Sequence, residues 1–169
     1  MIVITTRTGA MTGFPLCRHD IRIALHNMLS CLGLSGAHVE VILTDDGESA
    51  QLNREFLGCY GPTNILSFPA AGPVAAPRQE PDSPPACRKD SSHAEDDTDL
   101  GVLALSTGAV HRESFLYGQP PHRHALRLLA HGLLHLAGYD HGPQMDDMTE
   151  TLMQCATGKA AADTVVTGF

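Results

Sequence analysis

The chain has 169 residues, of which 43% are hydrophobic, and it carries 11 basic against 19 acidic side chains. This length suits one domain with a substantial core, no apolar run reaches the ~18–20 residues of a membrane helix, and the formal net charge of −8 lacks the basic footprint of most nucleic-acid-binding proteins. The five cysteines are odd in number and no pair is at C-x-x-C spacing, so we expect free thiols in a reducing compartment. The N-terminus lacks a signal-peptide pattern, so a secretory signal is not expected.

The first part of the chain predicts alternating strands and helices. Apolar residues recur at helical spacing in the second of these elements, and β-branched residues alternate in the third. An Asp-Asp-Gly sequence separates the third element from the fourth, where Asp46 is the expected N-cap. In chain order we expect a strand at 2–6, a helix at 18–32, a strand at 38–44, a helix at about 48–57 and a strand at 63–68.

Residues 70–99 differ from the rest of the chain in composition. They include five prolines, seven acidic residues and three basic ones, with almost no large apolar side chain. Such a segment cannot bury enough apolar surface to offset the entropy of ordering. We therefore expect a flexible, solvated insertion loop within one domain, and an acidic recruitment loop is the less favoured alternative.

The last part of the chain predicts one buried strand and three helices. Ser106 or Thr107 is expected to cap the first of these helices, and Gly138 to end the second. The third begins with Pro143, a residue suited to a first helical turn. In chain order we expect a strand at 101–106, helices at about 107–117, 122–137 and 143–156, and a frayed tail at 157–169.

Three histidines lie close together in the sequence HGLLHLAGYDH, which covers residues 131–141. His131 and His135 are four residues apart on a predicted helix, so their side chains share one face and can both reach one zinc ion. Gly138 can take the left-handed conformation that turns the chain and brings His141 back as a third ligand. Three protein ligands leave a fourth position for water, whose pKa zinc lowers to about 7, as in a catalytic site. The segment thus predicts metal binding.

The neighbours of the histidines suggest further roles. Asp140 is placed to orient a histidine ring, or simply to form the turn. Arg127 and His124 share the face of His131 and could meet a phosphate, although a surface cation and a helix-start histidine are the simpler interpretations. The leucines of this helix are expected to wall the site on its core side: Leu126, Leu128, Leu129, Leu133, Leu134 and Leu136.

The histidine spacing equals that of the metzincin proteases, H-E-x-x-H-x-x-G-x-x-H. Those enzymes use the glutamate after the first histidine as a general base. This chain has Gly132 there, which cannot accept a proton. A peptidase mechanism therefore lacks its base.

The histidine segment resembles the signature of the YbeY-type rRNA maturation factors, which are bacterial zinc-dependent endoribonucleases. Leu52-Asn53 together with PTNILSFP at 62–69 is similar to a second segment of that family, and LGVL at 100–103 to a third. Met148 and Glu150 suit the helix that follows the signature. The resemblance covers roughly residues 38–155 apart from the loop.

This resemblance implies an α/β (α+β) fold, in which a small mixed four-stranded sheet packs with about five helices, one of them a zincin-like histidine helix. It implies a single metallohydrolase domain over 1–156, with the flexible insertion at 70–99 and a C-terminal tail at 157–169. It also implies one Zn²⁺ ion bound by His131, His135 and His141.

The implied activity is cleavage of single-stranded RNA in the cytoplasm. The resemblance points to 3′-end processing of small-subunit rRNA and to ribosome quality control. The implied partners are rRNA and the small ribosomal subunit with its proteins, and neither DNA nor a membrane is expected.

Two positions depart from the family pattern. An arginine that the family uses toward RNA is Leu57 here, and an aspartate of its L-G-D strand is Val102. Arg54, one helical turn before Leu57, is a candidate to replace that arginine, and a solvated helix residue is the alternative. With His131 and His135 it completes our set of candidate catalytic residues.

Two other functions stay open at this stage. One is a ribosome-assembly or RNA-binding factor with a structural zinc ion and weak or no turnover. The other is a metallohydrolase that acts on another substrate, such as a peptide.

Overall fold

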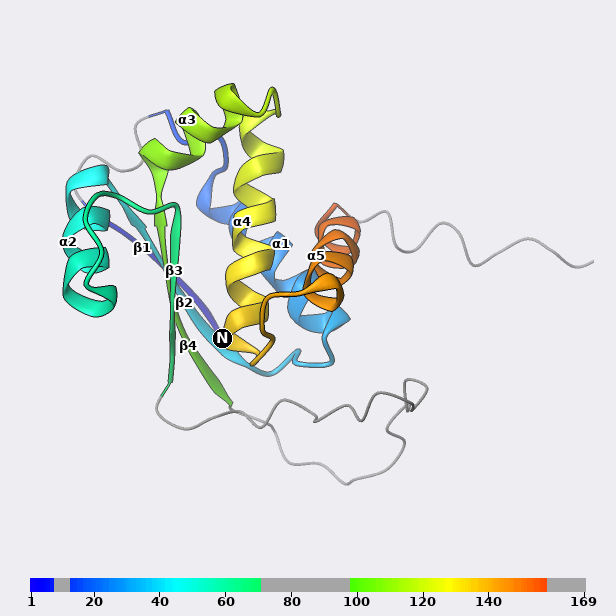
Figure 1. Ribbon diagram of the computed structural model, residues 1–169. Helices are drawn as coiled ribbons and strands as arrows, with labels where there is room; N and C mark the ends of the chain where they lie inside the picture. Colours follow the sequence, from blue (N-terminus) through cyan, green and yellow to red (C-terminus); the bar gives the residue numbers. More distant parts are fainter. Residues whose placement is uncertain (8–12, 71–97, 158–169) are drawn as a thin grey trace, which may run out of the picture.

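A four-stranded sheet with the strand order β1-β2-β4-β3 forms the centre of the molecule (Figure 1). β1, β2 and β4 are parallel, and β3 is antiparallel to β4, so the sheet is mixed as expected. The computed structural model describes residues 1–7, 13–70 and 98–157. The elements are β1 (Ile2–Thr6), α1 (Arg18–Cys31), β2 (His38–Thr44), α2 (Asp46–Leu57), β3 (Ile65–Pro69), β4 (Asp99–Ser106), α3 (Thr107–Leu116), α4 (Pro121–Leu136) and α5 (Pro143–Ala156).

Helices α1, α4 and α5 lie on one side of the sheet and α2 lies on the other (Figure 1). α4 is the central helix, because it contacts the sheet through β3 and β4 and also packs against α1, α3 and α5. The six leucines that the sequence assigned to its core side are all buried. Because burying apolar side chains is favourable, these leucines hold α4 against the sheet.

The N-cap of α2 corrects one prediction. Asp45 is the capping residue, since its side chain accepts a hydrogen bond from the Glu48 amide at 2.8 Å and its backbone is extended. Asp46 is already helical. Its carboxylate instead accepts a hydrogen bond from Ser106 at 2.9 Å and forms an ion pair with Arg112, which joins the starts of α2 and α3. Ser106 also caps α3, as one of the two expected alternatives.

β3 begins two residues later than predicted and includes Pro69. Thr63 is held outside the strand by Ser49, whose hydroxyl donates to the Thr63 carbonyl at 2.7 Å. Pro69 is tolerated because β3 is an edge strand of the sheet, where a missing amide hydrogen breaks no ladder.

The expected insertion loop at 70–99 lies mostly outside the described residues, as does the tail at 157–169. Asp99 is described and corrects the loop's boundary, since it belongs to β4 and pairs with His38 of β2. Within the described ranges no helix has the length and apolar character needed to cross a bilayer.

Candidate metal centre

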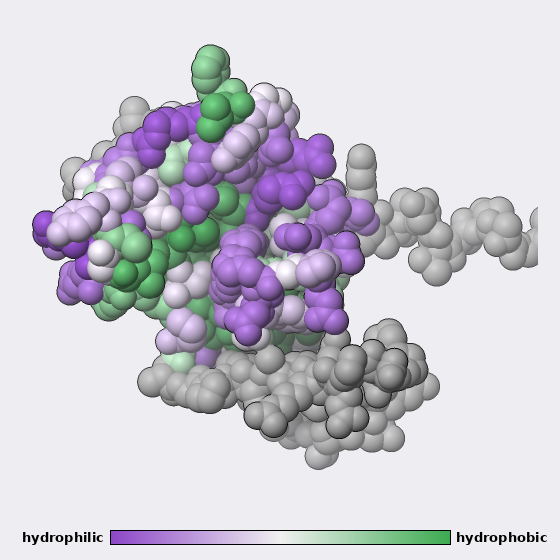
Figure 2. All heavy atoms as spheres, viewed as in Figure 1, coloured by the Kyte–Doolittle hydropathy of each residue, from purple (hydrophilic) through white to green (hydrophobic). Residues whose placement is uncertain are grey.

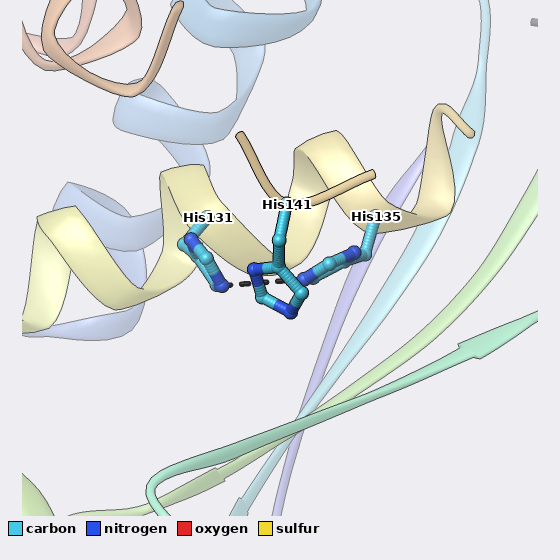
Figure 3. A group of neighbouring side chains, drawn as sticks. All are labelled: His131, His135 and His141. Carbon is cyan, nitrogen blue, oxygen red and sulfur yellow. Dashed lines mark hydrogen bonds between the residues drawn. The ribbon is translucent and has the colours of Figure 1, made fainter. Parts of the chain in front are cut away.

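The structure brings His131, His135 and His141 together at one end of α4 (Figure 3). His131 and His135 project from the same face of the helix, and His141 reaches back from the loop between α4 and α5. The three candidate ligand atoms lie within 4.8 Å of one another. The centroid of the His141 ring is 5.3 Å from that of His131 and 4.5 Å from that of His135.

The turn that returns His141 is built by Gly138. This residue has a φ of 86°, in the left-handed region that favours glycine. Its amide donates to the His135 carbonyl at 3.0 Å, and the next amide, of Tyr139, donates to the Leu134 carbonyl at 3.0 Å. These two bonds form a Schellman motif, which ends the helix and reverses the chain direction.

The donor geometry fits a single zinc ion. With Zn–N distances of about 2.0–2.1 Å, two nitrogens of a tetrahedral site lie about 3.3–3.4 Å apart. The Nε2 atoms of His131 and His135 are 3.2 Å apart. The ligand atom of His141 lies within 4.8 Å of those two atoms, and this side chain is exposed. Three imidazole nitrogens are also a donor set that zinc prefers.

A backbone carbonyl fixes the orientation of His135. Its Nδ1 lies 3.1 Å from the Tyr139 carbonyl oxygen, which can only accept a hydrogen bond. Nδ1 therefore carries the proton and donates, which leaves the lone pair on Nε2, the atom that faces His131. Asp140, expected either to orient a histidine or simply to form the turn, is exposed, and the Tyr139 carbonyl orients His135 instead. The charge of Asp140 acts on His135 only by raising its pKa slightly against the effect of burial.

The environment favours neutral histidines. Burial lowers the pKa of both His131 and His135, and the neighbouring imidazoles act in the same direction. The negative charge of Asp146 opposes this effect at His131. A lowered pKa matters here because only the neutral imidazole offers a lone pair to a metal.

The three histidines open onto a cavity of about 960 Å³. In the view of Figure 2, apolar surface lies in a hollow between α2 and the helices α4 and α5. The walls are β3 with residue 64 before it, the last turn of α2, and the facing sides of α4 and α5. Pockets of about 300–1,000 Å³ hold small ligands, so this cavity has room for part of a polymer such as a nucleotide.

Arg54 does not line this cavity. It is exposed on another side of α2 and borders a separate hollow with Tyr60 and Gly61. Leu57, which we expect at the position of the family's arginine, does line the histidine cavity and is 62% exposed. Position 57 therefore faces the cavity in which a substrate would bind, but its side chain is apolar.

Arg127 lines the cavity and donates through Nη2 to Glu150 at 2.9 Å. His124 is buried instead, with its Nε2 2.7 Å from the carboxylate of Glu113. A phosphate contact by His124 is thus contradicted. Glu113 also accepts a hydrogen bond from the side-chain amide of Asn64, a residue that lines the cavity. The sequence did not indicate this contact, because no local pattern links residues 49 positions apart.

Gly132 faces the sheet rather than the cavity. The Ser67 hydroxyl donates to the Gly132 carbonyl at 3.2 Å. A Cβ at this position would lie 2.7 Å from Cδ1 of Ile65 and 2.9 Å from Cδ2 of Leu103. A glutamate could not act here as it does in the metzincins, because the position is filled by the packing of α4 on the sheet.

Other cavity residues were also missed by sequence reasoning. Asp146 is the one carboxylate among the residues that line the cavity, and Phe56 and Phe68 form an aromatic part of its wall. Asp146 lies in the first turn of the helix predicted to begin at Pro143, so the sequence could have placed its carboxylate close to His141. Nothing local indicated that Phe56 and Phe68 would meet.

Comparison with known proteins adds family information. A sequence profile described as Endoribonuclease YbeY matches residues 16–161. The endoribonuclease YbeY of Oleidesulfovibrio alaskensis is 99% identical over the full length of both chains. That of Nitratidesulfovibrio vulgaris is 44% identical over 88% of this chain and 90% of its own. A solution structure of a Thermotoga maritima protein, TM1509, shares the fold with a TM-score of 0.60 at 22% identity, covering 94% of this chain and 91% of that one.

Proposed function

Because this chain belongs to the endoribonuclease YbeY family, we propose that it is a metal-dependent hydrolase that cleaves single-stranded RNA at the centre formed by His131, His135 and His141. The observation that carries this proposal is the convergence of three imidazoles on one large open cavity. We propose one zinc ion as the metal, since the distances and the donor set suit it.

The protein's own groups would prepare the site for this reaction. His131, His135 and His141 would hold the zinc ion, which would supply Lewis acidity toward a phosphoryl group and make water a better nucleophile near neutral pH. The Tyr139 carbonyl holds His135 in the tautomer that leaves Nε2 free. Arg127 lies on the cavity wall, where its guanidinium can attract a phosphate, although Glu150 already engages one of its nitrogens.

We further propose the 3′ end of small-subunit rRNA as the substrate, within the small ribosomal subunit in the cytoplasm. Family membership supports the substrate, and the free thiols of Cys17, Cys31, Cys59 and Cys155 are consistent with a reducing compartment. A single catalytic domain over 1–156 also remains part of this proposal. Arg54 stays a candidate for contacting RNA outside the cavity.

One observation favours a second candidate function. Leu57 lies on the cavity wall at the position where we expect the family's arginine, and its side chain brings no positive charge to the site. An assembly factor that binds RNA, with zinc and little turnover, would tolerate this loss better than a fast nuclease.

The test is cleavage of single-stranded rRNA fragments by the purified protein, with zinc content measured on the same sample. We expect one zinc per chain and cleavage that stops on addition of a chelator. His135→Ala should abolish both zinc binding and RNA cleavage. His111→Ala is the matched control, since this exposed histidine of α3 does not line the cavity.

Cleavage that persists without metal would contradict the proposal. Zinc-loaded protein that binds small subunits without cutting RNA would favour the assembly factor. Cleavage of a peptide library but not of RNA would point to another metallohydrolase.

A further inference from the structure

Two phenylalanines from different elements meet on the wall of the histidine cavity. Phe56 lies in the last turn of α2 and Phe68 lies in β3. Their ring centroids are 4.8 Å apart with an interplanar angle of 63°, an edge-to-face contact. Both side chains line the cavity that contains the three histidines.

Phe56 is held in place and yet open to solvent. Its side chain is 57% exposed, and Leu57 beside it is 62% exposed. Contact with Phe68 restricts the rotamers of the Phe56 ring, so a ligand that packs on the ring loses little further side-chain entropy. Adjacent exposed apolar side chains at the edge of a cavity are typical of a binding surface.

The charges of the cavity give little attraction for phosphates. Arg127 is the one lysine or arginine among the residues that line it, and Glu150 engages this side chain at 2.9 Å. Asp146 adds a negative charge to the same wall, and the chain as a whole carries a formal charge of −8. A single-stranded nucleic acid that enters here must therefore gain much of its affinity from contacts other than phosphate pairing. Base stacking on aromatic rings is the main alternative source.

We propose that Phe56, supported by Phe68, is a stacking platform for one nucleobase of single-stranded RNA beside the three-histidine centre. This inference depends on the proposed function, because it takes RNA as the occupant of the cavity. RNA is favoured over an apolar peptide because the chain belongs to an endoribonuclease family. A base must be unpaired to stack on a protein ring, so the platform would select single strands, with little preference among the four bases.

The experiment measures binding of a short single-stranded RNA that contains one 2-aminopurine, placed in turn at each position. Its fluorescence falls when the base stacks. The full chain is used, either loaded with zinc or treated with a chelator. Cleavage during the measurement is avoided by brief incubation or by an RNA with a non-cleavable backbone. Variants are Phe56→Ala, Phe56→Leu and Phe56→Trp. Phe115→Ala is the matched control, because Phe115 is 92% exposed on α3 and does not line the cavity.

We expect quenching at one position near the cleavage site. Phe56→Ala and Phe56→Leu should weaken binding about tenfold to a hundredfold and remove the quenching, whereas Phe56→Trp and Phe115→Ala should retain both. An abasic residue at the same position should weaken wild-type binding and have no added effect in Phe56→Leu. The affinity for RNA should also depend only weakly on salt. A plot of the logarithm of the binding constant against the logarithm of the salt concentration should have a slope of about −0.7 to −1.4, as for contacts to one or two phosphates.

Equal binding of RNA by wild type and Phe56→Leu, or quenching that survives in that variant, would overturn the platform while leaving the nuclease proposal intact. The leucine variant keeps an apolar side chain against Phe68, so it remains informative if Phe56→Ala unfolds. Failure of the wild type to bind or cut any single-stranded RNA would instead count against the proposed function itself.

Discussion

Replacing Gly132 by alanine tests how closely the histidine helix is packed on the sheet. An added Cβ would lie 2.7 Å from Ile65 Cδ1 and 2.9 Å from Leu103 Cδ2, both shorter than real contacts allow. Overpacking of this kind costs about 1–3 kcal/mol. The alanine gains about 1 kcal/mol of helix propensity, so the net loss in the free energy of unfolding is about 0–2 kcal/mol.

A second variant, Ile65→Val, removes the close contact with the added Cβ at position 132. Ile65→Val removes Cδ1, the nearer of the two atoms, at a cost of about 0.5–1.5 kcal/mol. If the clash is real, the double variant should lose about 1 kcal/mol less than the sum of the two single variants. The assay is urea unfolding of chelator-treated protein, so that metal binding adds nothing to the measured stability.

A stabilised Gly132→Ala variant together with strictly additive effects would refute this reasoning. Such a result would mean that the side chains of Ile65 and Leu103 can rotate away from the added Cβ at no cost. The explanation for the missing metzincin-type glutamate would then also fail, since it depends on the same close contact.

Three further predictions concern the framework around the site. Gly101→Ala should unfold the protein or lower its stability by several kcal/mol, because a Cβ there would lie 2.1 Å from the Phe68 carbonyl oxygen at a φ of 115°; circular dichroism and urea unfolding measure this. Asp46→Asn should flatten the acid limb of the stability curve: the hydrogen bond from Arg112 holds the pKa of Asp46 below 3.8, so its contribution is present above pH 3.8 and is lost as pH falls through the folded-state pKa. Ser106→Ala should cost about 1 kcal/mol in urea unfolding, since it removes the cap of α3 and the bond to Asp46.

Each of these predictions has an outcome that would contradict it. A soluble Gly101→Ala protein with wild-type stability would show that β3 and β4 can separate locally. An acid limb with the same slope in Asp46→Asn would mean that this carboxylate titrates alike in the folded and unfolded chain. A Ser106→Ala variant as stable as wild type would show that water replaces the lost cap.

The local structure of this chain was predictable because its causes are local. Helical spacing of leucines, a glycine after the last turn and a proline in the first turn act over only a few residues. These signals predicted α4, α5 and the bend at Gly138, and the spacing of His131 and His135 requires one shared face on any regular helix. The errors at Asp46 and at residues 63–68 are of one or two residues, where neighbouring polar side chains compete for the same backbone groups.

The membership of the cavity was not predictable in this way. Arg54 and Leu57 are three residues apart on one helix, and the chain alone does not indicate which of them turns toward the histidines. That choice depends on how α2 is rotated against the sheet. The same holds for Phe56 against Phe68, for Glu113 against Asn64, and for Gly132 against Ile65, pairs brought together by strand pairing and helix packing. Contacts of this kind depend on the sum of many weak interactions across the core, so no short pattern along the chain records them.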